Sequence, residues 1–402
     1  MDEGQAEVEV EAASAQSGVP LATVLRMVAG LSVVMSLLLG LHFYIGSRLI
    51  DGLGLSPTAN AASWAFLWSM FGSIFVGFIG GRLLRRPAAK VFQWLGFVWM
   101  GAFALLLTML AVSDLGLFVA GRLTTLPANV LELRSLAVLT LLVPALIWGF
   151  VSARAPAVRR VSVDIPGLHA DLDGFKLVQL SDVHIGETLD RRFSEFLVKT
   201  VNGLGADAVV ITGDMVDGSV ERLRDEVAPL AKLESRQGTF WVTGNHEYYS
   251  GAEQWMSEVE RMGMTVLHNA HRVLTRGAGE LVLGGVPDVQ GSSFSPSHRP
   301  DVQQAFRGAP VAPRVLLAHQ PRFARSASGA GVSLMLSGHT HGGQIFPFNF
   351  FVKLQQPVVS GFHVIEGVPT YTSAGTGYWG PPFRIGARGE VTELTLRAVP
   401  AS

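Results

Sequence analysis

Residues able to bind divalent metal ions follow five short hydrophobic runs in the second half of this 402-residue chain. The runs are residues 176–180, 208–212, 239–243, 315–318 and 334–337, and the polar residues after them are, in order, Asp182 and His184, Asp214, Asn245 and His246, His319, and His339 and His341. Their donor atoms are oxygen and nitrogen, which suits Mn²⁺, Fe or Zn²⁺. The chain has no cysteine, so thiolate metal sites and thiol nucleophiles are excluded.

The five runs have the length and composition of buried strands, and helical patterns at 191–204 and 252–262 lie between some of them. Alternation of strands and helices favours a sheet covered by helices. Because parallel sheets place their functional sites in the loops at the carboxyl ends of the strands, we expect the polar residues to converge there. Glycines that directly precede Asp214, Asn245 and His339 would allow the tight turns that direct these side chains inward.

The order and spacing of these residues resemble the motifs of the calcineurin-like metallophosphoesterase superfamily across most of residues 175–345. The matching segments are residues 181–186 (SDVHIG), 213–214 (GD), 244–247 (GNHE), His319 and residues 337–347 (SGHTHGGQIFP). With residues 373–390 (SAGTGYWGPPFRIGARGE), they further resemble the bacterial membrane-associated branch. The resemblance implies a four-layer α/β sandwich, in which helices cover two central sheets.

The resemblance also implies a role for each matching residue. It assigns one metal ion to Asp182, His184, Asp214 and His341, and a second to Asp214, Asn245, His319 and His339, with Asp214 bridging the two. His246 corresponds to the catalytic histidine of the family, and Glu247 stands where many members have Asp. The family favours manganese over iron or zinc for the two divalent ions.

The chemistry that such a centre supports is hydrolysis of a phosphodiester, pyrophosphate or phosphomonoester. Two ions about 3.5 to 4 Å apart would lower the pKa of a shared water, and the resulting hydroxide would attack phosphorus in line. The imidazole of His246 would protonate the departing oxygen or stabilise the developing charge. The alternatives are a protein phosphatase and a non-catalytic membrane phosphate sensor, although every ligand position of the family is filled.

The N-terminal part of the chain has the composition of a membrane protein. Residues 21–150 carry only 11 charged side chains. Uncharged stretches at 27–47, 52–81, 91–113 and 135–153 each reach the ~18 residues needed to cross a bilayer. We therefore predict a multi-pass α-helical membrane domain of four transmembrane helices (21–153), preceded by a mobile acidic tail (1–20) and followed by the metallophosphoesterase domain (154–402).

The number of lysine and arginine residues near the helix ends predicts how the chain is oriented in the membrane. Seven lie on one side of the membrane, in the loop after the second helix and in the segment after the fourth: Arg82, Arg85, Arg86, Lys90, Arg154, Arg159 and Arg160. Three lie on the other side: Arg48, Arg122 and Arg134. The count predicts a protein of the inner cell membrane with its catalytic domain on the cytoplasmic face.

The expected partners are the membrane and a phosphate ester, for which a lipid-linked ester is one candidate. A net charge of −1 disfavours nucleic acid. The three later membrane stretches lack ionisable side chains, which favours an anchor over a transporter. The aromatic run at 345–353, four residues after His341, either packs as core or forms an interfacial lip that guides a lipid headgroup to the metal centre.

Overall fold

The computed structural model describes residues 21–84 and 87–400, and these form two compact units. The first unit comprises the described part of Met1–Ser69 together with Met109–Ala137, and the second comprises Met70–Thr108 and Val138–Ser402 as far as residue 400. The helices at residues 57–83, 88–123 and 130–154 each have residues in both units. The predicted acidic tail at 1–20 lies outside the described residues, and the predicted domain boundaries stay a prediction.

Four long helices confirm the predicted membrane domain. They are α2 (Leu21–Ile45), α3 (Pro57–Leu83), α4 (Ala88–Leu123) and α5 (Val130–Arg154), and each is long and apolar enough to cross a membrane. Short π-helical and 3₁₀ turns prolong α2 to Leu53. Large apolar side chains such as Leu31, Phe118 and Leu141 are exposed on these helices, as expected of surfaces that face lipid.

Charged side chains join three helical segments inside the first unit. The carboxylate of Asp114 on α4 accepts hydrogen bonds from Tyr44 (2.9 Å) and Arg134 (2.6 Å) and lies 3.0 Å from Arg48 Nε. Arg134 is only 8% exposed and also donates to the backbone carbonyl of Arg48. Since the charges are paired, α2, α4 and α5 can carry ionic side chains at these positions despite their apolar surroundings.

Two six-stranded sheets form the centre of the second unit. The first has the strand order β1 (Ala157–Pro166), β12 (Glu390–Val399), β2 (Phe175–Leu180), β3 (Ala208–Thr212), β4 (Thr239–Val242) and β5 (Thr265–Val266). The second has the order β10 (Gly361–Ile365), β11 (Val368–Thr372), β9 (Val332–Ser337), β8 (Arg314–Leu317), β7 (Gly279–Gly285) and β6 (Ala270–Arg276). Strands β2 to β5 are mutually parallel, as are β7, β8, β9 and β11.

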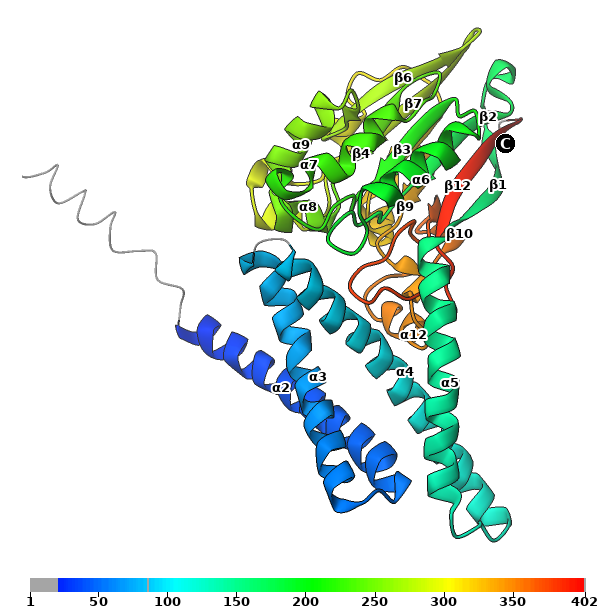
Figure 1. The fold of residues 1–402 in the computed structure, drawn as a ribbon. Coiled ribbons are helices and arrows are strands. Elements are labelled where there is room, and N and C mark those ends of the chain that lie inside the picture. Colours follow the sequence, from blue (N-terminus) through cyan, green and yellow to red (C-terminus); the bar gives the residue numbers. More distant parts are fainter. Residues whose placement is uncertain (1–20, 85–86, 401–402) are drawn as a thin grey trace, which may run out of the picture. The chain divides into compact units, whose positions relative to one another are not determined.

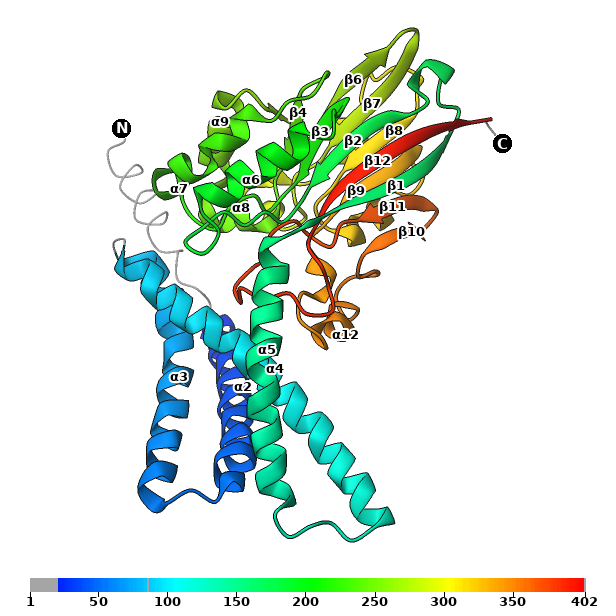
Figure 2. The ribbon, with the colours of Figure 1, turned by 45° about the vertical axis from the view of Figure 1, so that its right-hand side comes forward.

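The two sheets pack face to face through alternate residues of each strand. Phe175, Leu177 and Val210 of the first sheet share one buried cluster with Leu283 and Leu336 of the second. Figure 2 shows β1 and β12 lying over β8 and β9. Because both faces of the central strands are covered, these strands read in the sequence as continuous apolar runs.

Helices cover the outer face of each sheet and complete the predicted four-layer sandwich. On the first sheet these are α6 (Arg191–Asn202), α7 (Val220–Val227) and α9 (Ala252–Arg261), seen beside β3 and β4 in Figure 1. On the second they are α10 (Val302–Ala305) and α11 (Ala324–Ala327). Two further short helices lie at the predicted site: α8 (Asn245–Ser250) begins with Asn245 and His246, and α12 (Phe348–Val352) follows the loop that carries His339 and His341.

Candidate dinuclear metal centre

The predicted site residues leave the carboxyl ends of β2, β3, β4, β8 and β9, and five of them adopt an unusual backbone conformation. Asp182, His184, Asp214, His339 and His341 have φ between 50° and 70°. Non-glycine residues rarely occupy this left-handed region, which costs on the order of 1 kcal/mol or more each and is concentrated at functional sites. The backbone thus bends sharply after three different strands and turns these side chains toward one point.

One group of converging side chains contains Asp182, His184 and His341. Nε2 of His341 lies 3.1 Å from Nε2 of His184 and 3.5 Å from Oδ1 of Asp182. His184 hydrogen-bonds through Nδ1 to Asp217 (3.0 Å), so in its neutral form Nε2 carries the free lone pair. Three potential ligand atoms of this group lie within 4.8 Å of one another.

A second group contains Asn245, His319 and His339. Nε2 of His319 lies 3.2 Å from Oδ1 of Asn245 and 3.2 Å from Nδ1 of His339. Nδ1 of His319 donates to the backbone carbonyl of Thr212 (2.8 Å), which fixes the ring with Nε2 directed into the group.

Asp214 lies between the two groups. Its Oδ2 is 3.1 Å from Nε2 of His319 and 3.8 Å from Nε2 of His184. The residue is 2% exposed. Although burial opposes ionisation, the positive charges of His319 and His246 hold the pKa of Asp214 well below its usual value. The carboxylate therefore faces both groups in its charged form.

The electrostatics of the donor set fit bound cations. Burial, reinforced by His319, lowers the pKa of His339 to about 3, and burial together with His184 lowers that of His341 well below its usual value. Neutral imidazoles keep the lone pairs that metals bind. For His319 burial is outweighed by Asp214, which raises its pKa. The cluster thus favours positive charge between Asp214 and His319, which a proton or a metal ion can supply.

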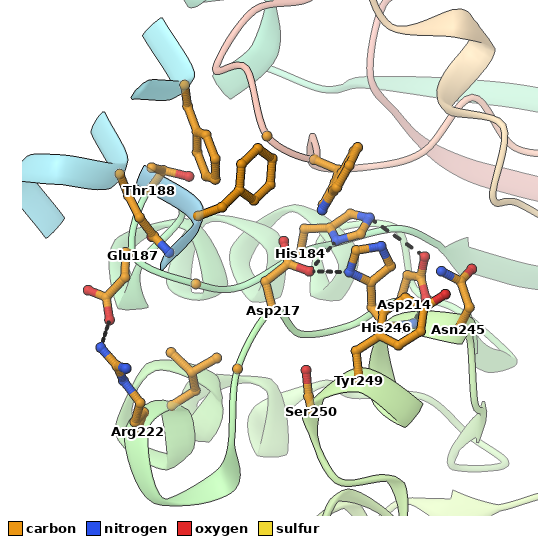
Figure 3. A pocket seen from close by; sticks show the side chains of 18 of the residues that line it. His184, Glu187, Thr188, Asp214, Asp217, Arg222, Asn245, His246, Tyr249 and Ser250 are labelled. Carbon is orange, nitrogen blue, oxygen red and sulfur yellow. Dashed lines mark hydrogen bonds and ion pairs between the residues drawn. The ribbon is translucent and has the colours of Figure 1, made fainter. Parts of the chain in front are cut away.

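His246 lies beside the two groups and has a carboxylate partner that the sequence motifs did not identify. Its Nδ1 is 2.6 Å from Oδ1 of Asp217, the same oxygen that bonds to His184 (Figure 3). Burial disfavours a charged His246, but the negative charges of Asp214 and Asp217 outweigh burial and raise its pKa to about 9. The pair of His246 and Asp217 thus favours a charged imidazole, and both residues line the pocket.

Glu247, which stands where the resemblance expects Asp, binds backbone N–H groups and is not the carboxylate that contacts His246. It is completely buried and accepts backbone N–H bonds from Gly244 (2.6 Å), Met215 (2.7 Å) and Asp214 (3.0 Å). Burial and the nearby charge of Asp214 raise its pKa to about 7. Glu247 holds the loop of Asp214 against the loop of Asn245, and Asp217 is the residue that orients His246.

Two glycines of the motifs are required by close contacts. A Cβ atom on Gly244 would overlap Asp214, and one on Gly338 would overlap the side chains of Ser181 and Asp182. Any larger residue would push apart loops that carry site residues. The sequence signal for these glycines was their place directly before Asn245 and His339.

Arg384 in the C-terminal loop also supports the site. Its guanidinium is fully buried and donates to the backbone carbonyls of Ala374 (2.8 Å), His341 (3.0 Å) and Gly377. Burial lowers its pKa to about 10, yet it stays charged at neutral pH. Arg384 thus fixes the loop that contains it to the backbone of His341.

The two groups open into a pocket of about 760 Å³. His184, Asp214, Asn245, His339 and His341 line it together with His246. Figure 3 shows Arg222 and Glu187, an ion pair at 3.3 Å, on another side of the same pocket. All eight predicted site residues are thus brought together: six line the pocket, and the buried Asp182 and His319 contact His341 and Asp214.

The fold and the two groups of potential metal ligands are those expected of a metallophosphoesterase. Comparison with known proteins leads to the same family. The chain belongs to the metallophosphoesterase family: residues 175–343 match the model of the calcineurin-like phosphoesterase domain. It is therefore a metal-dependent phosphoester hydrolase with a transmembrane N-terminal part.

Relatives occur in animals and bacteria. The chain is 35% identical to "Transmembrane protein with metallophosphoesterase domain" of Bos taurus, covering 91% of this chain and 88% of the relative, and 33% identical to the protein of the same name of Danio rerio, covering 90% and 87%. It is 38% identical to an "Uncharacterized metallophosphoesterase" of Helicobacter pylori, covering 62% and 66%. The two animal relatives match across both the membrane helices and the catalytic part.

Proposed function

We propose that this protein is a membrane-anchored phosphoesterase with two divalent metal ions. One ion would be held by Asp182, His184 and His341, the other by Asn245, His319 and His339, with Asp214 shared by both. The observation that carries the proposal is the convergence of seven donor side chains into two groups, with Oδ2 of Asp214 within 4 Å of a histidine of each group. The oxygen and nitrogen donors suit Mn²⁺, which the proposal favours, as well as Fe and Zn²⁺.

The chain's own residues supply the remaining steps of hydrolysis. The two ions, when bound, would activate a water molecule and neutralise charge on the phosphate oxygens. His246 has its Nε2 free to donate a proton to the oxygen that leaves phosphorus, because its Nδ1 is bonded to Asp217. Asp217 keeps the imidazole charged and oriented. The substrate would be a phosphodiester, a pyrophosphate or a phosphomonoester.

Loss of either ligand group should abolish this activity. Full-length protein in detergent should hydrolyse bis(p-nitrophenyl) phosphate only with added divalent metal, and His341→Ala and Asn245→Ala should each lose most of the activity, because each removes a donor from a different group. Substitution of the exposed Asp225 by Asn serves as a control. Hydrolysis by both ligand variants at the wild-type rate would refute the proposed centre.

We further propose that the protein lies in the inner membrane with its catalytic part in the cytoplasm. The support is the excess of lysine and arginine, seven against three, on the side that carries β1 and all later residues. Reporter fusions after Arg160 should therefore report the cytoplasm, and fusions in the loop containing Asp51 should report the outside. A tag at Ser402 that reagents reach in intact cells would contradict this orientation.

A lipid-linked substrate is the finer part of the proposal, and the aromatic run after His341 supports it. Phe346, Phe348, Phe350 and Phe351 are 46–59% exposed, which does not fit core packing. In this proposal they contact the bilayer surface, and Lys353 lies near lipid phosphates. The double variant Phe348→Ser/Phe351→Ser should hydrolyse a lipid phosphoester in vesicles more slowly, relative to a soluble aryl ester, than wild type does. An equal fall with both substrates would count against the lip.

A further inference from the structure

Side chains from two membrane-spanning helices form one wall of the catalytic pocket. Phe78 of α3 and Gln93 and Phe97 of α4 line the same pocket as Asp214 and His246, and all of them belong to the second compact unit. Phe97 is 9% exposed, whereas Phe78 is 38% exposed. The pocket thus has metal-binding side chains on one side and aromatic side chains on another.

Close packing of α3 against α4 fixes the position of this wall. Gly77 and Gly96 face each other, and a Cβ atom on Gly96 would come within 2.5 Å of the backbone oxygen of Ser73. Small residues let membrane helices approach closely, and the neighbouring side chains then have little freedom. Phe78 and Phe97, next to these glycines, have their ring centroids 5.2 Å apart in an edge-to-face arrangement.

Trp379 joins the wall to the catalytic histidine position. Its ring centroid is 6.3 Å from that of Phe78 and 5.6 Å from that of His246. A continuous row of rings therefore leads from Phe97 to His246. A phosphodiester whose phosphorus lay beside His246 would have one of its two ester substituents against this row.

The loop that carries Trp379 is fixed to the same helices. The ring of Phe383 lies so close to Gly101 of α4 that any Cβ there would overlap it. The backbone N–H of Arg384 donates to the carbonyl of Gly149 on α5 (2.9 Å). Arg154, at the end of α5, donates to the carbonyl of Thr188 (2.9 Å) and stacks over Tyr378. Within the second unit, these parts of α4 and α5 thus pack directly against the catalytic loops.

We propose that the wall formed by Phe78, Phe97 and Trp379 is a subsite for the hydrocarbon chain of a membrane lipid phosphoester. The inference rests on the proposed function and makes the membrane helices part of the substrate site. Beside the wall, Val76 and Ile79 of α3 and Leu95 of α4 are 43–56% exposed on segments that span the membrane. A hydrocarbon chain can therefore pass from lipid to the aromatic row while remaining in contact with apolar side chains.

The test is the dependence of hydrolysis on alkyl chain length. p-Nitrophenyl alkyl phosphodiesters from methyl to octyl, used below their micelle concentrations, are hydrolysed by full-length protein reconstituted in nanodiscs. For wild type we expect kcat/KM to rise by up to about fourfold for each of the first methylene groups that the wall buries. In Phe78→Ala the octyl-to-methyl ratio should fall by about tenfold, and Phe78→Leu, which keeps an apolar wall, should retain most of the ratio.

Trp148→Ala is the matched control, because Trp148 is an aromatic residue of α5 that is 59% exposed and is not among the described residues that line the pocket. It should keep the wild-type ratio. A ratio near one in wild type, or an equal change in Phe78→Ala and Trp148→Ala, would overturn the subsite even though hydrolysis of the methyl ester still supported the proposed function. Failure of metal-loaded wild type to hydrolyse any member of the series would instead overturn the proposed function, and the subsite with it.

Discussion

Asp214→Asn should lower phosphodiester hydrolysis by roughly 10³-fold or more, the largest effect that we expect from a single conservative substitution. Asp214 is the one carboxylate that faces both ligand groups, at 3.1 Å from His319 and 3.8 Å from His184. The amide has nearly the same shape but no charge, so it cannot neutralise two cations. The loss should appear in kcat and in the amount of metal retained after dialysis.

The fold should survive this substitution. Oδ1 of Asp214 accepts the backbone N–H of His246 (2.8 Å), and the oxygen of an asparagine side chain can replace that acceptor. Circular dichroism and detergent-solubilised yield should therefore match those of wild type, with Asp225→Asn again as the surface control. If Asp214→Asn kept wild-type activity and metal content, Asp214 would not bridge two ions.

His246→Ala is expected to lower kcat by roughly 10² to 10⁴-fold while both metal ions stay bound. The reason is that His246 supplies a proton rather than a donor atom to either ligand group. The loss should depend on the leaving group, because a nitrophenolate needs little protonation and an alkoxide needs much. The variant should thus be impaired far more with an alkyl ester than with a nitrophenyl ester.

The amount of bound metal distinguishes whether His246 donates a proton or binds a metal ion. A His246→Ala protein that had lost an ion would mean that His246 is a ligand. A loss that was the same for good and poor leaving groups would mean that it stabilises charge without donating a proton. Asp217→Asn should show the same dependence on the leaving group in weaker form, because Asp217 acts through its 2.6 Å contact with His246.

The sequence predicted the central strands because those strands are buried on both faces. The runs at 176–180 and 208–212 differ from β2 and β3 by at most one residue, since their side chains pack against helices on one side and the other sheet on the other. Strands at or near the sheet edges were not predicted. In β10 three of five residues are exposed, and the polar and apolar residues of β6 are intermixed, so neither has a distinct apolar run.

The candidate ligand residues could be located from the sequence because each closely follows such a strand, but their partners could not. Asp217 is three residues after Asp214, and its role depends on a loop that brings it to His184 and His246 together. Arg384 and Phe383 act through contacts with segments more than 30 residues away in the chain. In the sequence, Phe78 is one of many apolar residues of a predicted membrane helix. Its position in the pocket depends on packing between helices and catalytic loops, which the sequence does not show.

The central claim is that hydrolysis depends on two metal ions held by this one chain. The most direct measurement is the number of ions per protein, by inductively coupled plasma mass spectrometry, alongside the rate of bis(p-nitrophenyl) phosphate hydrolysis as manganese is returned to chelator-treated full-length protein. We predict that the rate reaches its maximum at two ions per chain and is negligible with none. Full activity in protein that holds no metal, or a maximum rate at one ion per chain, would contradict the account.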